Sequence, residues 1–456
     1  MEQNREKLSS RLGFILLSAG CAIGLGNVYR FPIITGAYGG AIFVLIYIAF
    51  LLLLGLPVMT AELAVGRASQ RSIASSFDKL EKPGQKWHLM KYAGIIGNYL
   101  LMMFYTTITG WMLMYFIKYA NGSILTASGV KELGDVFGTM ISNPGLSVLA
   151  TFAVILVCFG ICSLGLQKGV ERITKWMMVA LFVLMIGLAV YSCTLPGAGD
   201  GLRFYLVPSV RHIQESGLWT VISAAMGQSF FTLSLGIGSI AIFGSYIGKE
   251  HRLLGEGRTI VVLDTFVALM SGLIIFPAYF TYNGAPLTAG NAGAGFLFTT
   301  LSSIFNDMHM GRVIGTLFFL FMLFAALSTV IAVFENIMSF WLELTKLNRR
   351  QAALINIALL MVLALPAAFT ENLLSGVKIF GKSFMDLEDF IVSNLLLPIG
   401  SLVYVGFCTW RYGWGWDRYF AEVNTGKGLA MPKWIRPYMT YVLPVIIFAV
   451  LIMSVL

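Results

Sequence analysis

The sequence has few charged residues for its length. Only 12% of its 456 residues are Asp, Glu, Lys or Arg, against about 25% in a typical soluble domain. Hydrophobic residues make up 57%, and the mean hydropathy is +0.81. This composition excludes a soluble enzyme, a disordered chain and a disulfide scaffold. It indicates packed membrane helices rather than a β-barrel, whose short alternating strands give a weaker hydropathy signal.

Cysteine and histidine are also scarce. The five cysteines lie in or beside apolar runs without metal-ligand spacing, which is typical of small core side chains. The four histidines lie in predicted loops or at helix ends, with no Glu or Cys partner at a useful spacing. The sequence therefore predicts no catalytic or zinc constellation, no organic cofactor and no enzymatic activity.

Long apolar runs dominate what remains. A bilayer core about 30 Å thick needs roughly 20 apolar residues per helix, and the sequence offers eleven such stretches. No segment between them is long enough for a soluble domain, so we predict one transmembrane domain over residues 1–456. The stretches cover approximately residues 12–37, 41–65, 92–120, 146–166, 173–195, 218–247, 259–283, 313–344, 352–369, 387–410 and 436–456.

The distribution of basic residues predicts the orientation. Placing the amino terminus in the cytoplasm puts roughly three quarters of the 31 Lys and Arg residues on the cytoplasmic side. The net charge of +9 then reports orientation and not a nucleic-acid partner. We expect a multi-pass protein of the cell inner (plasma) membrane, in contact with the lipid bilayer, with its carboxyl terminus outside. A signal peptide over the first 25 residues is the alternative, but the apolar pattern continues through Cys21.

Two predicted spans carry a glycine interruption at similar depth, at residues 20–27 and 232–239. Each glycine costs a helix about 1 kcal/mol relative to alanine. Small-residue helix packing explains one such segment equally well. Two of them, at the starts of successive five-span sets, predict an inverted repeat with unwound midpoints. The first repeat would cover about 11–195, the second about 218–410, and an extra helix about 436–456.

Unwound backbone has a specific meaning in a membrane. The bilayer core has no water to satisfy freed N–H and C=O groups, so such backbone survives only where it lines a cavity or holds a ligand. A half-helix that begins after a break presents N–H groups and a positive dipole end to a carboxylate, and freed carbonyls suit a small cation. The two breaks therefore predict a site for a zwitterion and a cation.

Ionisable residues inside or near the spans point the same way. A charge near a helix centre costs about 2.5–3.5 kcal/mol on insertion scales. Asp264 lies in mid-span, and we interpret it as functional. Glu62 and Glu335 either take part directly in function or cap unwound backbone near the broken helices. Arg30 and Asp389 lie near helix ends.

The eighth span adds two adjacent hydroxyls, Ser328 and Thr329. Their ordinary role is to bond the carbonyl of the preceding turn.

Three segments resemble a known family. RLGFILLSAGCAIGLGNVYRFP (11–32), GQSFFTLSLGIGS (227–239) and FAALSTVIAVF (324–334) resemble the first, sixth and eighth helices of the neurotransmitter:sodium symporter family. The resemblance runs along nearly the whole chain. It implies an all-α integral membrane protein with a LeuT-type 5+5 inverted repeat, discontinuous helices 1 and 6, and eleven transmembrane helices. It also implies sodium-coupled uptake of amino acids or amines by alternating access.

The resemblance implies two sodium ions. Both would lie in hard oxygen sites without sulfur or imidazole, as an alkali cation requires. One ion would be held by the Ala22 carbonyl, Asn27, Thr232, Asp264 and the substrate carboxylate, and the other by the carbonyls of Gly20, Ile23 and Ala325 and the hydroxyls of Ser328 and Thr329.

The resemblance also implies a substrate site and two gates. The substrate carboxylate would meet the N–H groups of Leu25 and Gly26 and the hydroxyl of Tyr105, and the amine would meet the carbonyls of Ala22, Phe231 and Thr232. Its side chain would be surrounded by Leu101, Phe231, Ser234, Ile237, Thr329 and Val333. Arg30 with Asp389, and Phe231 with Tyr105, would close the outside, and Arg5 with Glu343, helped by Tyr246, would close the inside.

Departures from the family pattern narrow the expectation. Gly24 stands where amine-transporting members carry an aspartate, which favours a substrate with its own carboxylate. Ile237 and Val333 should enlarge the pocket for a hydrophobic or aromatic L-amino acid. Ala268 replaces the serine of chloride-dependent members, and the Asp264 carboxylate would supply the negative charge instead. We therefore expect chloride-independent transport, with Asp264 protonated on the return step.

Other functions stay open at this point. A transporter-like amino-acid sensor or a channel would bind without accumulating its ligand, and a symporter of another small solute, such as an amine, would accumulate it. The sequence offers no ring of identical polar residues of the kind that forms a channel filter. A sensor would normally carry an additional cytoplasmic domain. Sodium-coupled amino-acid import is the function that the sequence favours.

Overall fold

The computed structural model describes residues 7–209, 217–283 and 295–455, and over these residues the fold is helical without a β-strand. The first half holds α1 (Arg11–Ala22), α2 (Phe31–Ala37), α3 (Ala41–Phe50), α4 (Leu56–Ser69), α5 (Ser76–Leu80), α6 (Met90–Asn121), α7 (Gly129–Ile141), α8 (Pro144–Ser163), α9 (Arg172–Cys193) and α10 (Ala198–Leu206). The second half holds α12 (Leu218–Thr232), α13 (Ala241–Gly244), α14 (Leu253–Asn283), α15 (Leu301–Asp307), α16 (Gly311–Leu344), α17 (Arg349–Leu363), α18 (Leu365–Ala368), α19 (Phe384–Phe390), α20 (Leu397–Thr409), α21 (Trp416–Val423) and α22 (Leu443–Val455).

Several of these helices join into longer rods suited to crossing a membrane. Among the described residues, eight continuous helices are long and apolar enough to span, and a ninth crossing consists of α1 and the segment Gly26–Ala37, bent by 54°. α12 and α17, with 15 residues each, correspond to the sixth and ninth predicted spans but are shorter. The chain is therefore a multi-pass helical protein, and the count of eleven stays a prediction.

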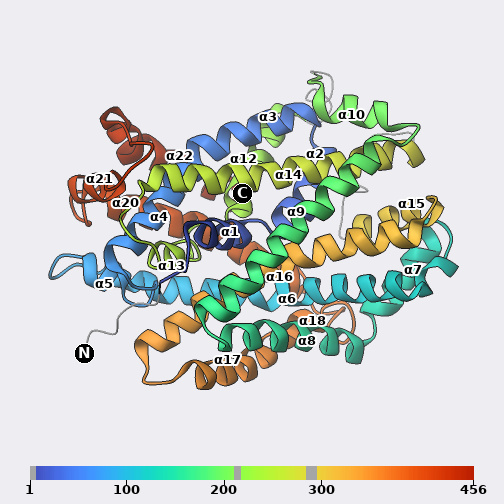
Figure 1. Ribbon diagram of the computed structural model, residues 1–456, viewed down its shortest axis with the longest axis horizontal. Helices are drawn as coiled ribbons and strands as arrows, with labels where there is room; N and C mark the ends of the chain where they lie inside the picture. The colour runs from blue at the N-terminus through green and yellow to red at the C-terminus, as the bar shows by residue number, and fades with distance from the viewer. Residues whose placement is uncertain (1–6, 210–216, 284–294, 456) are drawn as a thin grey trace.

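The long helices lie roughly side by side (Figure 1). α5 and α21 are at one end of the molecule, and α7, α10 and α15 are at the other. The first group comes from segments that the charge distribution predicts to be cytoplasmic. The structure thus gathers these segments at a single end.

Burial separates a central helix from peripheral ones. In α16, 78% of an apolar 18-residue stretch is buried inside the protein. In the span that ends in α22, only 28% of such a stretch is buried. Peripheral helices expose large apolar side chains, such as Val183 of α9 at 66% and Val445 of α22 at 68%. Such faces are costly in water and favourable against lipid tails. The membrane environment predicted from composition therefore fits the surface of the fold.

Both predicted helix interruptions are present. α1 ends at Ala22, and a π-helical turn begins only at Gly26. α12 ends at Thr232, and α13 begins at Ala241. In the second break, Gly236 and Gly238 have φ of 98° and 78°, a region that side chains rarely adopt. A Cβ on Gly236 would also overlap the carbonyl oxygen of Leu397.

Candidate functional site

The unwound backbone of the second break is held by two buried side chains from other helices. Glu62 of α4 accepts a hydrogen bond from the N–H of Gly236. The amide nitrogen of Asn98, in α6, donates to the carbonyl of Ile237 at 2.9 Å. Glu62 thus caps the break, one of the two roles expected for it. Asn98 is missing from the predicted site, although a buried amide in an apolar span was a signal for it.

The first break is held in the same way. The amide nitrogen of Gln228 in α12 donates to the carbonyl of Gly26 at 2.7 Å. The hydroxyl of Ser271 in α14 donates to the carbonyl of Asn27 at 2.8 Å. Because no water reaches such groups in a membrane core, these contacts make the open backbone tolerable. The two breaks are therefore preformed parts of the fold.

The residues predicted for one sodium ion come together between the breaks. The Asp264 carboxylate in α14 accepts from the Asn27 amide nitrogen at 2.8 Å and from the Thr232 hydroxyl at 3.2 Å. All three side chains are almost fully buried. The Asn27 side-chain oxygen accepts from the N–H of Gly24 at 3.1 Å. One carboxylate and two neutral oxygens, close together and shielded from solvent, form a donor set that fits a small hard cation.

The five oxygens predicted for the second sodium also converge. The Ser328 hydroxyl donates to the carbonyls of Ile23 at 3.4 Å and Ala325 at 2.9 Å. The Thr329 hydroxyl lies 3.2 Å from the carbonyls of both Gly20 and Ile23, and 3.5 Å from that of Ala325. The back-bonding role expected for these hydroxyls is real, but they also face the freed carbonyls of α1. A cation there would join α1 to α16.

A narrow cavity of about 10 Å³ lies between the breaks. At its side, the Tyr105 hydroxyl accepts from the N–H of Leu25 at 2.8 Å. Leu397, at the start of α20, belongs to this lining and is missing from the predicted set. The lining residues are Ala22, Gly24, Gly26, Leu101, Tyr105, Phe231, Ser234, Thr329 and Leu397.

Two of the residues predicted to surround the substrate side chain do not line this cavity. Val333 and Ile237 are both almost fully buried, yet neither is among its lining residues. After the left-handed turn at Gly236, the Ile237 side chain packs toward α6, where a Cβ on Gly97 would lie 2.7 Å from its Cγ2. In this arrangement the broken backbone directs the Ile237 side chain away from the cavity, so the enlargement expected from Ile237 stays a prediction.

A second cavity, of about 260 Å³, lies above the first on the side of the predicted outer gate. Tyr105 and Phe231 line both cavities and so form the boundary between them. Arg30 and Asp389 line the upper one, but no ion pair joins them in the described part of the chain. The Arg30 guanidinium lies 4.3 Å from the centroid of the Phe231 ring, a cation–π contact. Asp389 accepts from the Ser393 hydroxyl at 2.7 Å.

The rim of this upper cavity is acidic. Glu371, Asp386 and Asp389 line it, against Arg30. Desolvation, together with the nearby carboxylate of Asp386, raises the pKa of Glu371 above its ordinary value. A cleft lined mainly by one sign of charge concentrates the opposite ions. The entrance therefore favours cations.

The side of the predicted inner gate has a different arrangement from the expected one. The Tyr246 hydroxyl donates to Glu335 at 2.8 Å, and Glu335 forms an ion pair with Arg349. Glu343 accepts from the Ser72 N–H at 2.6 Å, and it also accepts from the Ser75 hydroxyl at 2.7 Å. Its predicted partner Arg5 lies outside the described residues. Glu335 is thus bound by the guanidinium of Arg349 and the hydroxyl of Tyr246. The sequence analysis expected for it either a functional role or the capping of unwound backbone.

The start of the first helix is docked by two carboxylates that the sequence analysis missed. Glu171 accepts from the Ser9 N–H at 2.9 Å and from its hydroxyl at 2.5 Å. Arg11 lies 2.9 Å from the carboxylate of Glu256 in α14. Both pairs join residues more than 150 positions apart, so no local pattern could reveal them. They fix the start of the first helix against α14 and against the turn that precedes α9.

One expectation about histidine is corrected. His88 lies 2.6 Å from the Glu81 carboxylate, with Asp78 beside them. The three side chains are exposed or half-buried, and Lys91 lies 3.4 Å from Asp78. A lysine in the cluster disfavours a cation. We therefore interpret the group as a surface ion-pair network, which a loop brought together.

Comparisons with known proteins identify the family of the chain. The chain matches the sodium:neurotransmitter symporter family over residues 5–127 and 128–456. It is 34% identical to the sodium-dependent transporter YhdH of Bacillus subtilis over 402 residues, 88% of this chain and 87% of that protein. It is 25% identical to the sodium-dependent neutral amino acid transporter B(0)AT2 of Mus musculus over 303 residues, 60% of this chain and 41% of that protein.

A solved structure extends the comparison. The crystal structure of MhsT in complex with L-phenylalanine matches with a TM-score of 0.87 at 34% identity, covering 99% of this chain and 100% of that one. The fold is therefore the LeuT fold, and the protein is a sodium-dependent transporter and not an enzyme. Sodium is the coupling ion of such transporters. The chain belongs to the sodium:neurotransmitter symporter family.

Proposed function

We propose that the protein is a symporter that imports a hydrophobic or aromatic L-amino acid together with two sodium ions, without a chloride requirement. The observation that carries the proposal is that two oxygen sets form at the helix breaks. One contains the carboxylate of Asp264, and the other gathers the hydroxyls of Ser328 and Thr329 onto carbonyls of α1. MhsT, crystallised with L-phenylalanine, supports an amino acid as the substrate.

The cavity favours an amino acid over an amine for a chemical reason. Position 24 is glycine, so the cavity has no carboxylate from that position to pair with an amine. The N–H of Leu25 and the hydroxyl of Tyr105 instead lie 2.8 Å apart at its side. Such donors suit the carboxylate of an amino acid. That carboxylate would complete the shell of the first sodium.

The chloride proposal rests on α14. Asp264 supplies a fixed negative charge in contact with Asn27 and Thr232. Ala268, one turn later, is fully buried and has no hydroxyl to offer an anion. The carboxylate therefore takes the part that chloride would otherwise play beside the cation. We also propose that Asp264 accepts a proton on the return step.

Coupling follows from which helices each ion joins. The second sodium would bind carbonyls of α1 and hydroxyls of α16, so it favours the arrangement in which these helices meet. The first would bind α14, the end of α12 and the break after α1. An ion shifts a conformational equilibrium only by its difference in affinity between the two states. Binding of both ions with substrate thus stabilises a closed site, and we propose that Arg30 then pairs with Asp389 outside.

Uptake by proteoliposomes tests the proposal. Vesicles containing the purified protein are given each of twenty labelled amino acids, with and without an inward sodium gradient and in chloride or gluconate medium. We expect accumulation of one or a few apolar or aromatic amino acids that needs sodium and persists in gluconate. Binding without accumulation would indicate a sensor. Accumulation that disappears in gluconate would contradict the chloride proposal alone.

Changing Tyr105 to phenylalanine is expected to weaken substrate binding by roughly 10- to 100-fold. The carboxylate loses a hydroxyl donor in a dry site, which is worth about 1.5–3 kcal/mol for a charged partner. Substrate affinity is measured by scintillation proximity with purified protein. Tyr92, exposed at the start of α6, is a matched control, and its change to phenylalanine should leave affinity unchanged. Wild-type affinity in the Tyr105 variant would remove this residue from the site.

A further inference from the structure

A third cavity, of about 310 Å³, lies away from the transport site between the start of the first helix and the segment that follows α13. One wall comes from residues 7–14 and the other from residues 246–256. Its second wall follows α13, which lies toward the end of the molecule that carries α5 and α21 (Figure 1). We propose that this end faces the cytoplasm, so the cavity would meet cytoplasmic solutes.

The two walls carry opposite charges. Lys7 and Arg11 line the cavity on the helix side, and Glu250 and Glu256 line it on the other. Lys7 and Glu250 are exposed, whereas Glu256 is only 2% exposed. Phe14, also buried, gives the cavity an apolar part. Opposed charges beside an apolar surface suit a dipolar ligand with an apolar side chain.

Glu256 has an unused acceptor. One of its oxygens, Oε1, binds Arg11 at 2.9 Å. The other, Oε2, is buried and has no hydrogen-bond partner among the described residues. Leaving a buried acceptor unsatisfied costs about 1–3 kcal/mol. A ligand with an ammonium group would satisfy it.

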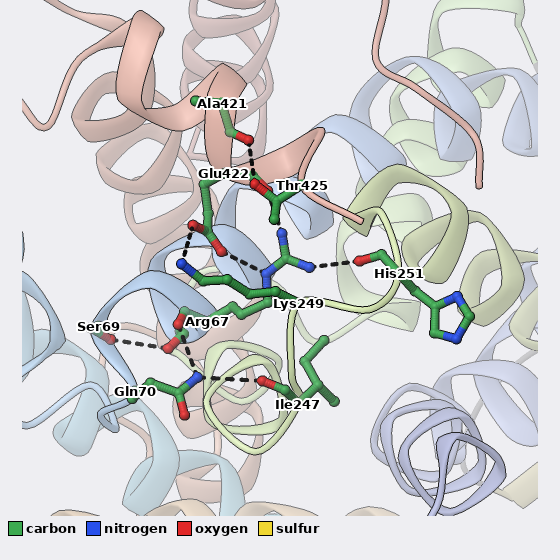
Figure 2. A network of polar contacts seen from close by, with 10 residues as sticks. Arg67, Ser69, Gln70, Ile247, Lys249, His251, Ala421, Glu422 and Thr425 are labelled. Carbon is green, nitrogen blue, oxygen red and sulfur yellow. Dashed lines mark hydrogen bonds and ion pairs between the residues drawn. The ribbon is translucent and has the colours of Figure 1, made fainter. Parts of the chain in front are cut away.

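The cavity wall formed by residues 246–256 is fixed by contacts with other helices. Arg67 of α4, fully buried, donates to the carbonyl of His251 at 2.7 Å and to the carboxylate of Glu422 in α21 at 2.6 Å. Lys249 lies 3.6 Å from the same carboxylate. Figure 2 shows this network, with the ring of His251 turned away from Arg67. His251 also lines the cavity, so the wall is fixed by α4 and α21, independently of α1.

We propose that this cavity is a second, regulatory site for a free amino acid on the cytoplasmic side. The ammonium group binds Glu256 and Glu250, the carboxylate binds Lys7, and the side chain packs on Phe14. The volume of about 310 Å³ is at the small end of the roughly 300–1,000 Å³ range of ligand pockets, which fits an amino acid. Neither of the two proposed sodium oxygen sets is among its lining residues, so binding there depends on charge pairing and not on the ion.

The consequence for transport rests on the proposed function. A ligand that contacts both walls binds more tightly when α1 is docked than when it has moved away. It therefore shifts the population toward the docked state by that difference in affinity. If release of substrate into the cytoplasm requires α1 to undock, a high cytoplasmic amino-acid concentration slows further import.

Binding stoichiometry tests the site. Purified full-length protein is dialysed to equilibrium against labelled L-phenylalanine in sodium buffer. We expect two molecules per wild-type chain and one in the double variant Lys7→Gln, Glu250→Gln, both exposed positions that spare the fold. A control double variant, Lys175→Gln with Asp200→Asn, also neutralises an exposed pair and should retain two.

The variant Gly24→Ala separates this proposal from the proposed function, because it blocks the central cavity. It should retain one molecule per chain, and that binding should persist when choline replaces sodium. A single molecule per wild-type chain that Gly24→Ala removes would overturn the regulatory site while leaving the transport proposal intact. If the Gly24→Ala variant binds as many molecules per chain as the wild type, the central cavity does not bind the amino acid, which would count against the transport site instead. Two molecules in the Lys7, Glu250 double variant, or none in the wild type, would also overturn the regulatory site.

Discussion

Replacing Gly24 with alanine is expected to lower sodium-driven amino-acid uptake by roughly 100-fold. A Cβ at this position would overlap the hydroxyl oxygens of both Tyr105 and Thr329. Overpacking of this kind costs about 1–3 kcal/mol, and each 1.4 kcal/mol is a factor of about ten. The two hydroxyls belong to different parts of the site, one to the proposed substrate contact and one to the second sodium set. One added methyl group therefore disturbs both.

The measurement is initial uptake by proteoliposomes, with the amount of reconstituted protein and its melting temperature recorded in parallel. Gly227→Ala in α12 is the matched control, because a Cβ there meets nothing within 4 Å. Alanine in a helix should leave stability equal or raise it by about 1 kcal/mol. If the Gly24 variant folds and transports at the wild-type rate, the cavity between the breaks is not the substrate site.

Changing Asp264 to asparagine is expected to reduce sodium affinity by about 100-fold or more in chloride-free medium. Its partners Asn27 and Thr232 are neutral, so in the proposed first sodium site this carboxylate would be the protein's balancing charge. Removing one partner of a buried charge pair costs about 3–5 kcal/mol. Because asparagine keeps the shape and one oxygen, an added small anion can supply the missing charge. Chloride should therefore restore part of the uptake.

The test compares sodium concentration curves in chloride and in gluconate for both proteins. Asp200→Asn, at an exposed position in α10, removes a carboxylate away from the site and should change neither curve. Superimposable curves for wild type and the Asp264 variant in both media would show that the carboxylate has no part in ion binding. A uniform loss that chloride does not relieve would retain Asp264 as a sodium ligand and reject its role as a substitute for chloride.

Hydropathy and glycine placement predicted much of the fold. The stretches 12–37 and 218–247 contain the two broken elements, and the breaks occur at the glycine-rich segments expected for them. These features are predictable because they are local. Apolar length determines whether a segment can cross a bilayer, and a left-handed backbone requires glycine wherever it occurs.

The residues of the two proposed oxygen sets were predicted through the resemblance and not through the pattern alone. Ser328 and Thr329 by themselves indicate ordinary back-bonding, which the structure indeed contains. Their approach to Gly20 and Ile23 depends on how α16 packs against α1. The residues suggested the ligand chemistry, and the packing brought the ligands together.

Partner choice among the charged groups was decided only by the tertiary structure. Glu335 binds Tyr246 and Arg349, Glu256 binds Arg11, and Glu62 caps the second break. Each sequence position allowed several partners, because an ion pair forms wherever the fold brings opposite charges within reach. The same holds for Ile237, whose side chain follows the turn of the broken backbone and not its place in the motif. A membrane protein with two interrupted spans follows from the sequence alone, because apolar length and the glycine preference of left-handed backbone act within a segment. The packing of helices distant in sequence assembles the two proposed oxygen sets and selects the carboxylate that caps a helix break and the one that docks the first helix, because those roles depend on distances that no local pattern encodes.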